Sequence, residues 1–262
     1  MTHVVVTGGT RGFGFGLVEA FVARGCRVTL CGRSERSVQA ALSRLPAGVC
    51  GVVADVQRYA DVVQLYDAAV AEHGPVDLFI NNAGTSNAQQ DFVDLTPESI
   101  DRVVGVNLLG TMHGCRVALE RMREAGRGHV FLMEGFGSDG RVQPGMAPYG
   151  ATKRAIRYLT RALVRETKGG PVKVSRLSPG IVVTDLLLDV YRHGDPANFA
   201  RQRWLFEVIA DPVEPVARWM ADRILAGPRH GAFVAWMTVP KAALRFLQPR
   251  YHRRRLFAAL EV

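Results

Sequence analysis

Residues 3–14 read His3-Val4-Val5-Val6-Thr7-Gly8-Gly9-Thr10-Arg11-Gly12-Phe13-Gly14, a β-branched run that leads into a glycine-rich turn. A helical pattern follows at about residues 15–24. Glycine lets the backbone approach a pyrophosphate, which then meets the free N–H groups and the positive dipole end of the helix. Glycine clusters also mark ordinary turns, but the place of this one between a first strand and a first helix favours a dinucleotide-binding loop. The residues predicted to bind the dinucleotide here are Thr7, Gly8, Thr10, Arg11, Gly12, Phe13 and Gly14.

Short apolar runs alternate with helical patterns along the rest of the chain, which predicts a parallel sheet covered by helices. The expected strands are His3–Thr7, Arg27–Cys31, Val49–Val53, Val76–Ile80, His129–Met133, Val172–Leu177 and Ala232–Trp236. The expected helices cover about 15–24, 34–44, 57–72, 98–125, 147–168 and 212–226, with a less regular region at 184–210. No linker or repeat interrupts this pattern, so we expect residues 1–262 to form one domain. Its expected fold class is α/β, a Rossmann-type three-layer αβα sandwich with a seven-stranded parallel sheet.

The composition is that of a folded globular chain. Of its 262 residues 48% are hydrophobic and 22% are charged, which is too apolar for a disordered protein. No apolar run approaches the roughly 18 residues that span a bilayer, and the N-terminus lacks the pattern of a secretory signal, so we expect a cytoplasmic location. The four cysteines are scattered without ligand spacing, so neither a disulfide framework nor a metal site is expected.

The formal net charge is +9, and more than half of it lies at the C-terminus. From Lys241 onward six basic residues stand against one acid, Glu261, which gives +5. In residues 239–262 these cations alternate with apolar positions, and such a segment can lie on an anionic membrane surface. The alternatives are a solvated C-terminus or a segment that packs on a neighbouring subunit. Nucleic-acid binding explains the charge less well, because the basic residues occupy one short run.

The end of the second strand predicts which dinucleotide binds. An acidic residue usually stands there in NAD-binding proteins, where it accepts a hydrogen bond from the ribose 2′-hydroxyl. This chain has Arg33 followed by Ser34, and Arg11 adds a second guanidinium in the glycine turn. A fork of donors suits a 2′-phosphate, so we expect NADP(H) rather than NAD(H). The alternative is that both arginines are simply solvated.

A tyrosine and a lysine stand four residues apart at the start of a predicted helix, in the run Tyr149-Gly150-Ala151-Thr152-Lys153. This spacing places the phenol and the ammonium on one face of the helix. A neighbouring cation favours the ionised form of tyrosine, so the pair can exchange a proton near neutral pH. That is acid–base chemistry suited to a carbonyl or an alcohol.

Together with Asn81-Asn82-Ala83-Gly84 and Asn107, these motifs resemble the short-chain dehydrogenase/reductase family from residue 3 to about 235. The resemblance implies that Tyr149 is the proton donor, that Lys153 binds the nicotinamide ribose and lowers the tyrosine pKa, and that Asn107 holds a water of the proton relay. It also implies a set of cofactor contacts beyond the glycine turn. They are Asp55 and Val56 at the adenine, Asn82, Ala83 and Gly84 near the adenosine, and Pro179, Gly180, Val182 and Thr184 at the nicotinamide end.

The sequence departs from the family at its serine, which normally precedes the tyrosine by thirteen positions. That position is Phe136 here, and the nearest hydroxyl is Ser138, eleven residues before Tyr149. We expect Ser138 to substitute if the flanking glycines let the loop bulge. The run Gly135-Phe136-Gly137-Ser138-Asp139-Gly140 resembles the chlorophyll(ide) b reductases, a branch whose members use NADPH to reduce the 7-formyl group to hydroxymethyl.

An apolar, aromatic segment at 186–209 is the candidate substrate lid, because the segment after the sixth strand usually closes over the substrate in this fold. The residues expected to contact the substrate are Phe136, Ser138, Leu187, Tyr191 and Trp204. The alternative is that the lid residues pack in the core or an oligomer interface.

We therefore expect an NADPH-dependent enzyme that reduces a carbonyl on a small-molecule substrate, which we expect to be large and apolar. The alternatives are a general ketone, acyl-thioester or alcohol oxidoreductase, and, motivated by Phe136, an NADP(H)-binding sensor without activity. The resemblance further implies a homodimer or homotetramer assembled through residues 98–125 and 147–168.

Overall fold

The computed structural model describes residues 1–192 and 196–257, without the side chains of 191, 192 and 196–199. Within these residues seven strands form one parallel sheet in the order β3-β2-β1-β4-β5-β6-β7. The strands are β1 (His3–Val6), β2 (Arg27–Gly32), β3 (Cys50–Val53), β4 (Leu78–Asn81), β5 (Gly128–Met133), β6 (Val172–Ser178) and β7 (Phe233–Ala235). The predicted seven-stranded parallel sheet is confirmed.

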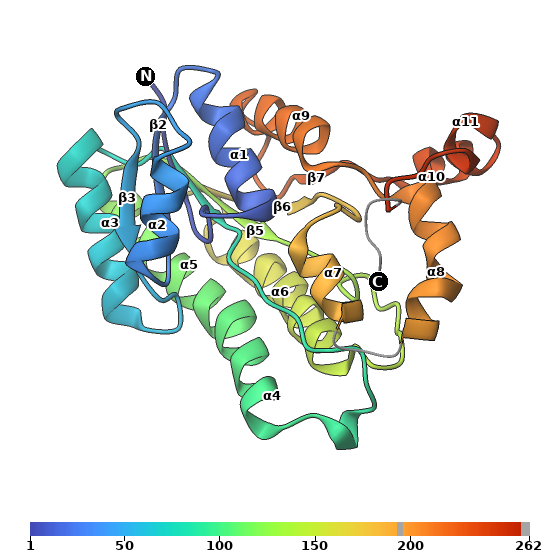
Figure 1. Ribbon diagram of the computed structural model, residues 1–262. Helices are drawn as coiled ribbons and strands as arrows, with labels where there is room; N and C mark the ends of the chain where they lie inside the picture. The colour runs from blue at the N-terminus through green and yellow to red at the C-terminus, as the bar shows by residue number, and fades with distance from the viewer. Residues whose placement is uncertain (193–195, 258–262) are drawn as a thin grey trace.

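The sheet has a helical layer on each face (Figure 1). Side chains of β1 alternate between the two layers, as the period of a strand requires: Val4 and Val6 enter one core and Val5 enters the other. The first core is covered by α1 (Gly12–Val22), α2 (Glu35–Leu42) and α9 (Val213–Leu225). The second lies under α3 (Tyr59–His73), α5 (Gly110–Glu124) and α6 (Ala147–Glu166). The expected three-layer αβα sandwich therefore forms.

The helix predicted over 98–125 is in fact interrupted. It consists of α4 (Pro97–Val104), the π-helical turn η2 (Gly105–Leu109) and α5, after a short 3₁₀ turn η1 (Phe92–Asp94). Asn107 lies in η2 and is fully buried. The apolar residues continue through this turn without a break, so the sequence does not indicate the extra residue that a π-helical turn contains.

The order of the strands reverses between β1 and β4, which are neighbours in the sheet. The chain leaves β1 towards β2 on one side, and leaves β4 towards β5 on the other. Ligands of open α/β sheets bind at such a switch point, beyond the carboxyl ends of the strands. The glycine turn follows β1, and Asn82-Ala83-Gly84 follows β4, so both lie at this point.

The region expected to be irregular forms α7 (Asp185–Arg192) and α8 (Pro196–Ile209). The C-terminal tail continues as α10 (Val239–Phe246) and α11 (Pro249–His252), and both helices pack against α8 (Figure 1). The described part of the tail is therefore folded onto its own chain, and it is not the freely solvated C-terminus that was one of the alternatives. Of the helices that the structure describes, none is long and apolar enough to cross a membrane.

Asp211 is the centre of the contacts that hold the tail. Its carboxylate accepts hydrogen bonds from Arg245 Nη2 at 2.7 Å, from Arg254 Nη2 at 3.2 Å and from Trp236 Nε1 at 2.6 Å. At the end of the tail Phe257 is fully buried in a cluster with Leu188 and Phe206 of α7 and α8. Part of the basic charge that the sequence placed in a free tail is thus neutralised inside the protein.

Candidate active site

The two loops at the switch point are in direct contact. Thr7 Oγ1 accepts hydrogen bonds from the N–H groups of Asn82 and Ala83, both at 3.0 Å. A Cβ atom at Gly8, which has φ +63°, would lie 2.8 Å from Ala83 Cα. A Cβ at Gly14 would lie 2.2 Å from the Gly8 carbonyl oxygen. These positions therefore require glycine, as the sequence pattern predicted.

The N-terminus of α1 is open to an anion. Arg11 precedes the helix and makes no side-chain cap, and the first turn has no acidic residue. Free backbone N–H groups and the helix dipole therefore face the switch point without a competing negative charge. The side chain of Phe13 packs against the first core, so mainly the backbone of this residue can contact a dinucleotide.

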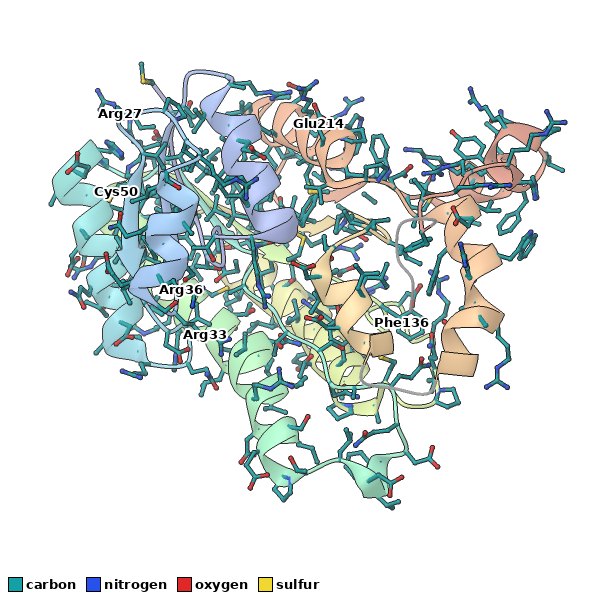
Figure 2. The ribbon with its side chains drawn as sticks, in the orientation of Figure 1. Arg27, Arg33, Arg36, Cys50, Phe136 and Glu214 are labelled. Carbon is teal, nitrogen blue, oxygen red and sulfur yellow. The ribbon has the colours of Figure 1, made fainter. Side chains whose placement is uncertain are left out.

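The residues expected at the adenosine end lie around β2 and β3. Arg33 is exposed, and neither Arg33 nor Arg11 forms an ion pair with any described residue. Ser34 is the N-cap of α2, and its Oγ accepts the Ser37 N–H at 3.3 Å. Arg36 adds a further cation in the first turn of α2, three residues after Arg33, at the same end of the molecule in Figure 2.

Asp55 and Val56 border the same end. The Asp55 carboxylate accepts from the backbone N–H of Gln57 at 3.0 Å, and Val56 is buried beneath Gly110, where a Cβ would lie 2.6 Å from its side chain. This loop is therefore held in place by its own contacts.

The segment after β6 reaches back to the glycine turn. Gly180 has φ +75°, and Val182 pairs with Asp211 in an isolated bridge. A Cβ at Gly12 would lie 3.7 Å from the side chain of Thr184. The run from Pro179 to Thr184 therefore lies against the same switch point, although about 170 residues separate it from Gly12 in the sequence.

Lys153 is buried beside the backbone of β5. Its Nζ donates to the Met133 carbonyl at 3.2 Å, and burial lowers the pKa of its ammonium to about 8. Gly84 lies close by, because a Cβ there would be 3.8 Å from Nζ and 3.5 Å from Asn107 Oδ1. The loop after β4 thus joins the two predicted catalytic residues.

The half-buried Tyr149 lies on the same face of α6, with Lys153 Nζ 5.6 Å from the centre of its ring. Burial raises the pKa of its hydroxyl to about 12, because the ionised form loses solvation. In the chain alone this effect outweighs the lowering expected from Lys153. Tyr149 is therefore a neutral O–H donor at physiological pH, which suits a general acid.

Asn107 connects these elements. Its Oδ1 accepts the Thr85 N–H at 2.8 Å, while its Nδ2 donates to the Thr85 carbonyl at 2.9 Å and to Thr152 Oγ1 at 3.1 Å. The amide therefore links the loop after β4 to α6.

The loop after β5 places Ser138 next to Gly135 rather than towards open space. Ser138 Oγ donates to the Gly135 carbonyl at 2.6 Å and accepts the Gly135 N–H at 3.0 Å. A Cβ at Gly135 would lie 2.5 Å from Tyr149 Oη, so the loop touches the phenol through its backbone. Phe136, at the position of the family serine, is 37% exposed and lies on the side of α7 and α8 (Figure 2).

The expected lid residues do not gather in one place. Leu187 packs against the cluster of Leu188, Phe206 and Phe257. Trp204 is 58% exposed, and its ring lies 5.7 Å from that of Phe246 in the tail. The side chain of Tyr191 lies outside the described residues.

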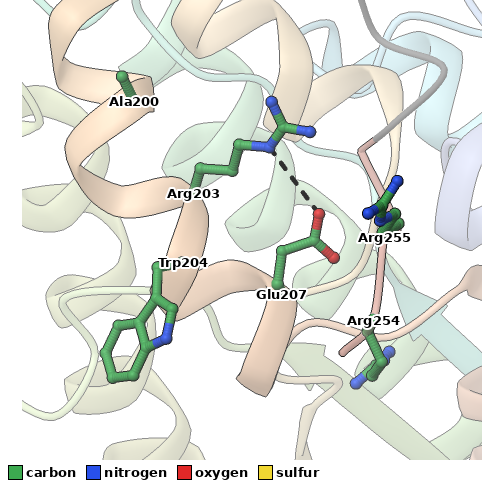
Figure 3. A pocket seen from close by; sticks show the side chains of 6 residues that line it. All are labelled: Ala200, Arg203, Trp204, Glu207, Arg254 and Arg255. Carbon is green, nitrogen blue, oxygen red and sulfur yellow. Dashed lines mark ion pairs between the residues drawn. The ribbon is translucent and has the colours of Figure 1, made fainter. Parts of the chain in front are cut away.

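Trp204 also borders an open cavity of about 580 Å³ (Figure 3). The cavity is lined by Ala200, Arg203, Trp204, Glu207, Arg254 and Arg255. It lies between α8 and the tail, so these contacts associate Trp204 with the tail and not with Tyr149.

Comparisons with known proteins agree with this geometry. A family model described as short chain dehydrogenase matches residues 2–193. Chlorophyll(ide) b reductase NOL, chloroplastic, of Oryza sativa subsp. japonica is 36% identical over 258 residues, which cover 93% of this chain and 73% of that protein. The protein of the same name from Arabidopsis thaliana is 35% identical, with 92% and 71% covered. A probable chlorophyll(ide) b reductase of O. sativa is 33% identical, and the chain spans 53% of its length.

Solved structures give the same architecture. Levodione reductase matches with a TM-score of 0.82 at 25% identity, covering 92% of this chain and 98% of that one. A 3-ketoacyl-(acyl-carrier-protein) reductase from Brucella melitensis, complexed with NADH, matches with a TM-score of 0.79 over the same shares. At 24% identity this second match shows the fold alone.

The expected cytoplasmic location is contradicted by these comparisons. The three plant relatives are named as chloroplastic proteins. The expectation rested on the absence of an apolar signal at the N-terminus, and that absence does not define a compartment.

Proposed function

The chain belongs to the short-chain dehydrogenase family, and from this premise we propose that it reduces a carbonyl group to an alcohol with NADPH, with Tyr149 as the proton donor. The observation that carries the proposal is the side-by-side placement of Tyr149 and Lys153 beneath the loop after β4. The dinucleotide loop lies at the same end of the sheet.

The residues at the switch point fit a nicotinamide dinucleotide. The glycine turn offers a cradle that Cβ atoms would fill, and the uncapped start of α1 suits the pyrophosphate. When bound, the dinucleotide supplies a hydride to the carbonyl carbon. Two residues would border the reacting end of the dinucleotide. Gly84 lies close to Lys153, and Thr184 lies close to Gly12 of the glycine turn.

Arg33 supports the preference for NADPH over NADH. Its exposed guanidinium has no ion-pair partner among the described residues, so its charge is available to a 2′-phosphate. Arg36 follows it three residues later in the first turn of α2 and Arg11 belongs to the glycine turn, while Asp55 is already engaged by Gln57.

The proton step uses groups of this chain. Tyr149 transfers its phenolic proton to the carbonyl oxygen while the carbon accepts the hydride, so that an aldehyde, NADPH and one proton become an alcohol and NADP⁺. The ammonium of Lys153 stabilises the phenolate left behind and returns a proton to it from solvent. Asn107 holds the loop after β4 against α6, which keeps Lys153 in place. Ser138 fixes the Gly135 peptide against the phenol.

For the substrate we propose a formyl group on a large apolar ring, as in chlorophyll(ide) b. Support comes from the names of the plant relatives. The test is to incubate the protein with NADPH and chlorophyllide b, and in parallel with simpler aldehydes, ketones and acyl thioesters, and to identify the product by mass. Reduction of the ring aldehyde supports the proposal. Turnover of the simpler carbonyls alone would favour the general reductase, and no turnover with retained NADPH binding would favour the sensor.

We further propose that the protein is a homo-oligomer. Tyr158 of α6 is 77% exposed and Met112 of α5 is 41% exposed, so the outer surface of the second layer carries uncovered apolar groups. Sedimentation velocity of the wild type and of Tyr158→Glu tests this, since a second copy that covers the face would be lost in the variant.

Membrane contact is proposed for α10 rather than for the whole tail. Leu244 is 54% exposed and Leu247 is 79% exposed, and the basic residues Arg250, Arg253 and Arg255 lie nearby in the sequence. Co-sedimentation with vesicles that contain an anionic phospholipid should be lost in Leu244→Ser/Leu247→Ser. Equal binding by both forms would refute the contact.

A further inference from the structure

A buried carboxylate lies directly after β5, next to the Tyr149–Lys153 pair. Glu134 is 4% exposed, and its Oε1 accepts a hydrogen bond from Arg176 Nη1 at 3.0 Å. The Glu134 N–H donates to the Leu177 carbonyl at 2.8 Å. Arg176 is held in turn, because its guanidinium carbon lies 3.9 Å from the centre of the Phe233 ring. Both charges are therefore fixed on neighbouring strands.

The residues on both sides of Glu134 lie against Lys153. Met133 accepts the hydrogen bond of Lys153 Nζ at 3.2 Å, and a Cβ at Gly135 would lie 3.2 Å from Lys153 Cε. The carboxylate of Glu134 and the ammonium of Lys153 are both buried and attract one another, since little solvent screens them. The acid at position 134 thus bears directly on the charge of Lys153.

Other charged groups near Lys153 are engaged elsewhere or uncharged at neutral pH. On its own helix Tyr149 is neutral, and Arg154 donates to the Ser138 carbonyl at 3.1 Å. Arg102 of α4 donates to Thr85 Oγ1 at 2.9 Å, and η2 contains no titratable residue. Burial lowers the pKa of Lys153, and the attraction of Glu134 opposes that loss.

We propose that Glu134 is a positioning residue of the reaction, whose carboxylate, held by Arg176, keeps Lys153 in the ammonium form that proton transfer through Tyr149 requires. The use of Lys153 in catalysis rests on the proposed function, whereas the effect of Glu134 on its charge does not. The two are therefore tested separately.

The first test observes Lys153 without any turnover. The chain contains only four lysines, 153, 168, 173 and 241, so the ε-carbon signals of lysine-labelled protein can be followed individually by NMR. In Glu134→Gln we expect the titration midpoint of Lys153 to fall by about one pH unit, because an attractive charge is lost. An unchanged midpoint would overturn the proposal.

Matched variants separate the charge from the fold. Glu134→Asp keeps a carboxylate and should restore most of the midpoint. Glu214→Gln removes a carboxylate that pairs with Arg218 at 2.6 Å on the exposed surface of α9, far from Phe136 in Figure 2, and should leave the midpoint unchanged. If Glu134→Gln does not fold, Glu134→Gln/Arg176→Met removes the carboxylate without leaving an unpaired guanidinium. Because a repulsive charge is lost with the attractive one, we expect a smaller fall in the same direction.

The second test is the pH profile of kcat/KM. In Glu134→Gln the decline at alkaline pH should begin at a pH lower by the same amount as the NMR midpoint, and Glu134→Asp should reverse it. A shifted NMR midpoint with an unshifted activity profile would overturn the role of Lys153 in the proposed function and leave the electrostatic effect of Glu134 intact.

Discussion

Replacing Phe257 by alanine tests whether the C-terminal tail is part of the folded enzyme. The side chain is fully buried among Leu188, Val190 and Phe206, so its truncation removes apolar contacts from both α7 and α8. Phenylalanine-to-alanine changes in a core cost about 3–5 kcal/mol. Phe257 lies near the C-terminus, so we expect the lost free energy to appear first as detachment of the tail from α7 and α8. The loss in stability cannot exceed the free energy with which the tail docks there. At about 1.4 kcal/mol for each factor of ten, a loss of 3 kcal/mol raises the detached population about 100-fold.

Limited trypsin digestion measures this population, because cleavage at Arg253, Arg254 or Arg255 requires a backbone that has left the surface. We expect Phe257→Ala to be cut there about 100-fold faster, as followed by intact mass, when reclosing is faster than cleavage. Because α7 and α8 lose their support, KM for the carbonyl substrate should rise more than the Kd for NADPH.

The control is Leu247→Ala, which truncates a side chain that is 79% exposed immediately after α10. It should be cut at the wild-type rate. Equal protection of Phe257→Ala and wild type would refute the docking of the tail.

Three further substitutions and one titration test the site. Tyr149→Phe should lower turnover about 10²–10⁴-fold while NADPH affinity, measured by fluorescence titration, stays the same, and an active variant would remove Tyr149 as the acid. Arg33→Asp should shift the ratio of kcat/KM from NADPH towards NADH, and an unchanged ratio would show that Arg33 does not contact the 2′-phosphate. Ser138→Ala loses both bonds to the Gly135 peptide and should cost about 1–3 kcal/mol in a urea melt, so an unchanged melt would contradict the buried turn. Since Lys153 is charged below its pKa of about 8 and neutral above it, kcat/KM should fall as pH rises through 8, and a flat profile to pH 9.5 would refute its role.

Most of the sheet could be predicted because its signal is local. In β1 the valines at 4, 5 and 6 are buried on both faces, and a continuous β-branched run bounded by a turn is what such a strand needs. The glycines at 8, 12 and 14 could also be predicted. Close backbone contacts exclude a side chain at 8 and 14, and a positive φ favours glycine at 8 and 12. The sequence pattern therefore predicts the structure correctly where the type of residue by itself restricts the backbone conformation.

The sequence predicted which residues form the candidate site, but not the hydrogen bonds that their side chains make. Tyr149 and Lys153 share a helix face by spacing alone. The hydroxyl of Ser138 could have faced the substrate or its own loop, and only the fold of that loop turns it to Gly135. Asn107 was predicted from the family resemblance, but its place in a π-helical turn and the bonds of its amide to Thr85 and Thr152 had no local signal in the sequence. Glu134 carried no motif at all.

The sequence by itself determined the order of strands and helices, the glycine turn after β1 and the shared helix face of Tyr149 and Lys153, because each of these depends on residues within one or two turns of one another. The tertiary structure alone decided which distant charges meet. Asp211 binds Arg245 and Arg254 across 34 and 43 residues, and Glu134 binds Arg176 across 42. A basic tail has the same sequence pattern whether it is free or docked. Charge and hydropathy show which kinds of group a residue can bind, but not which group it does bind. Its partner is set only when the chain has folded and removed both groups from water.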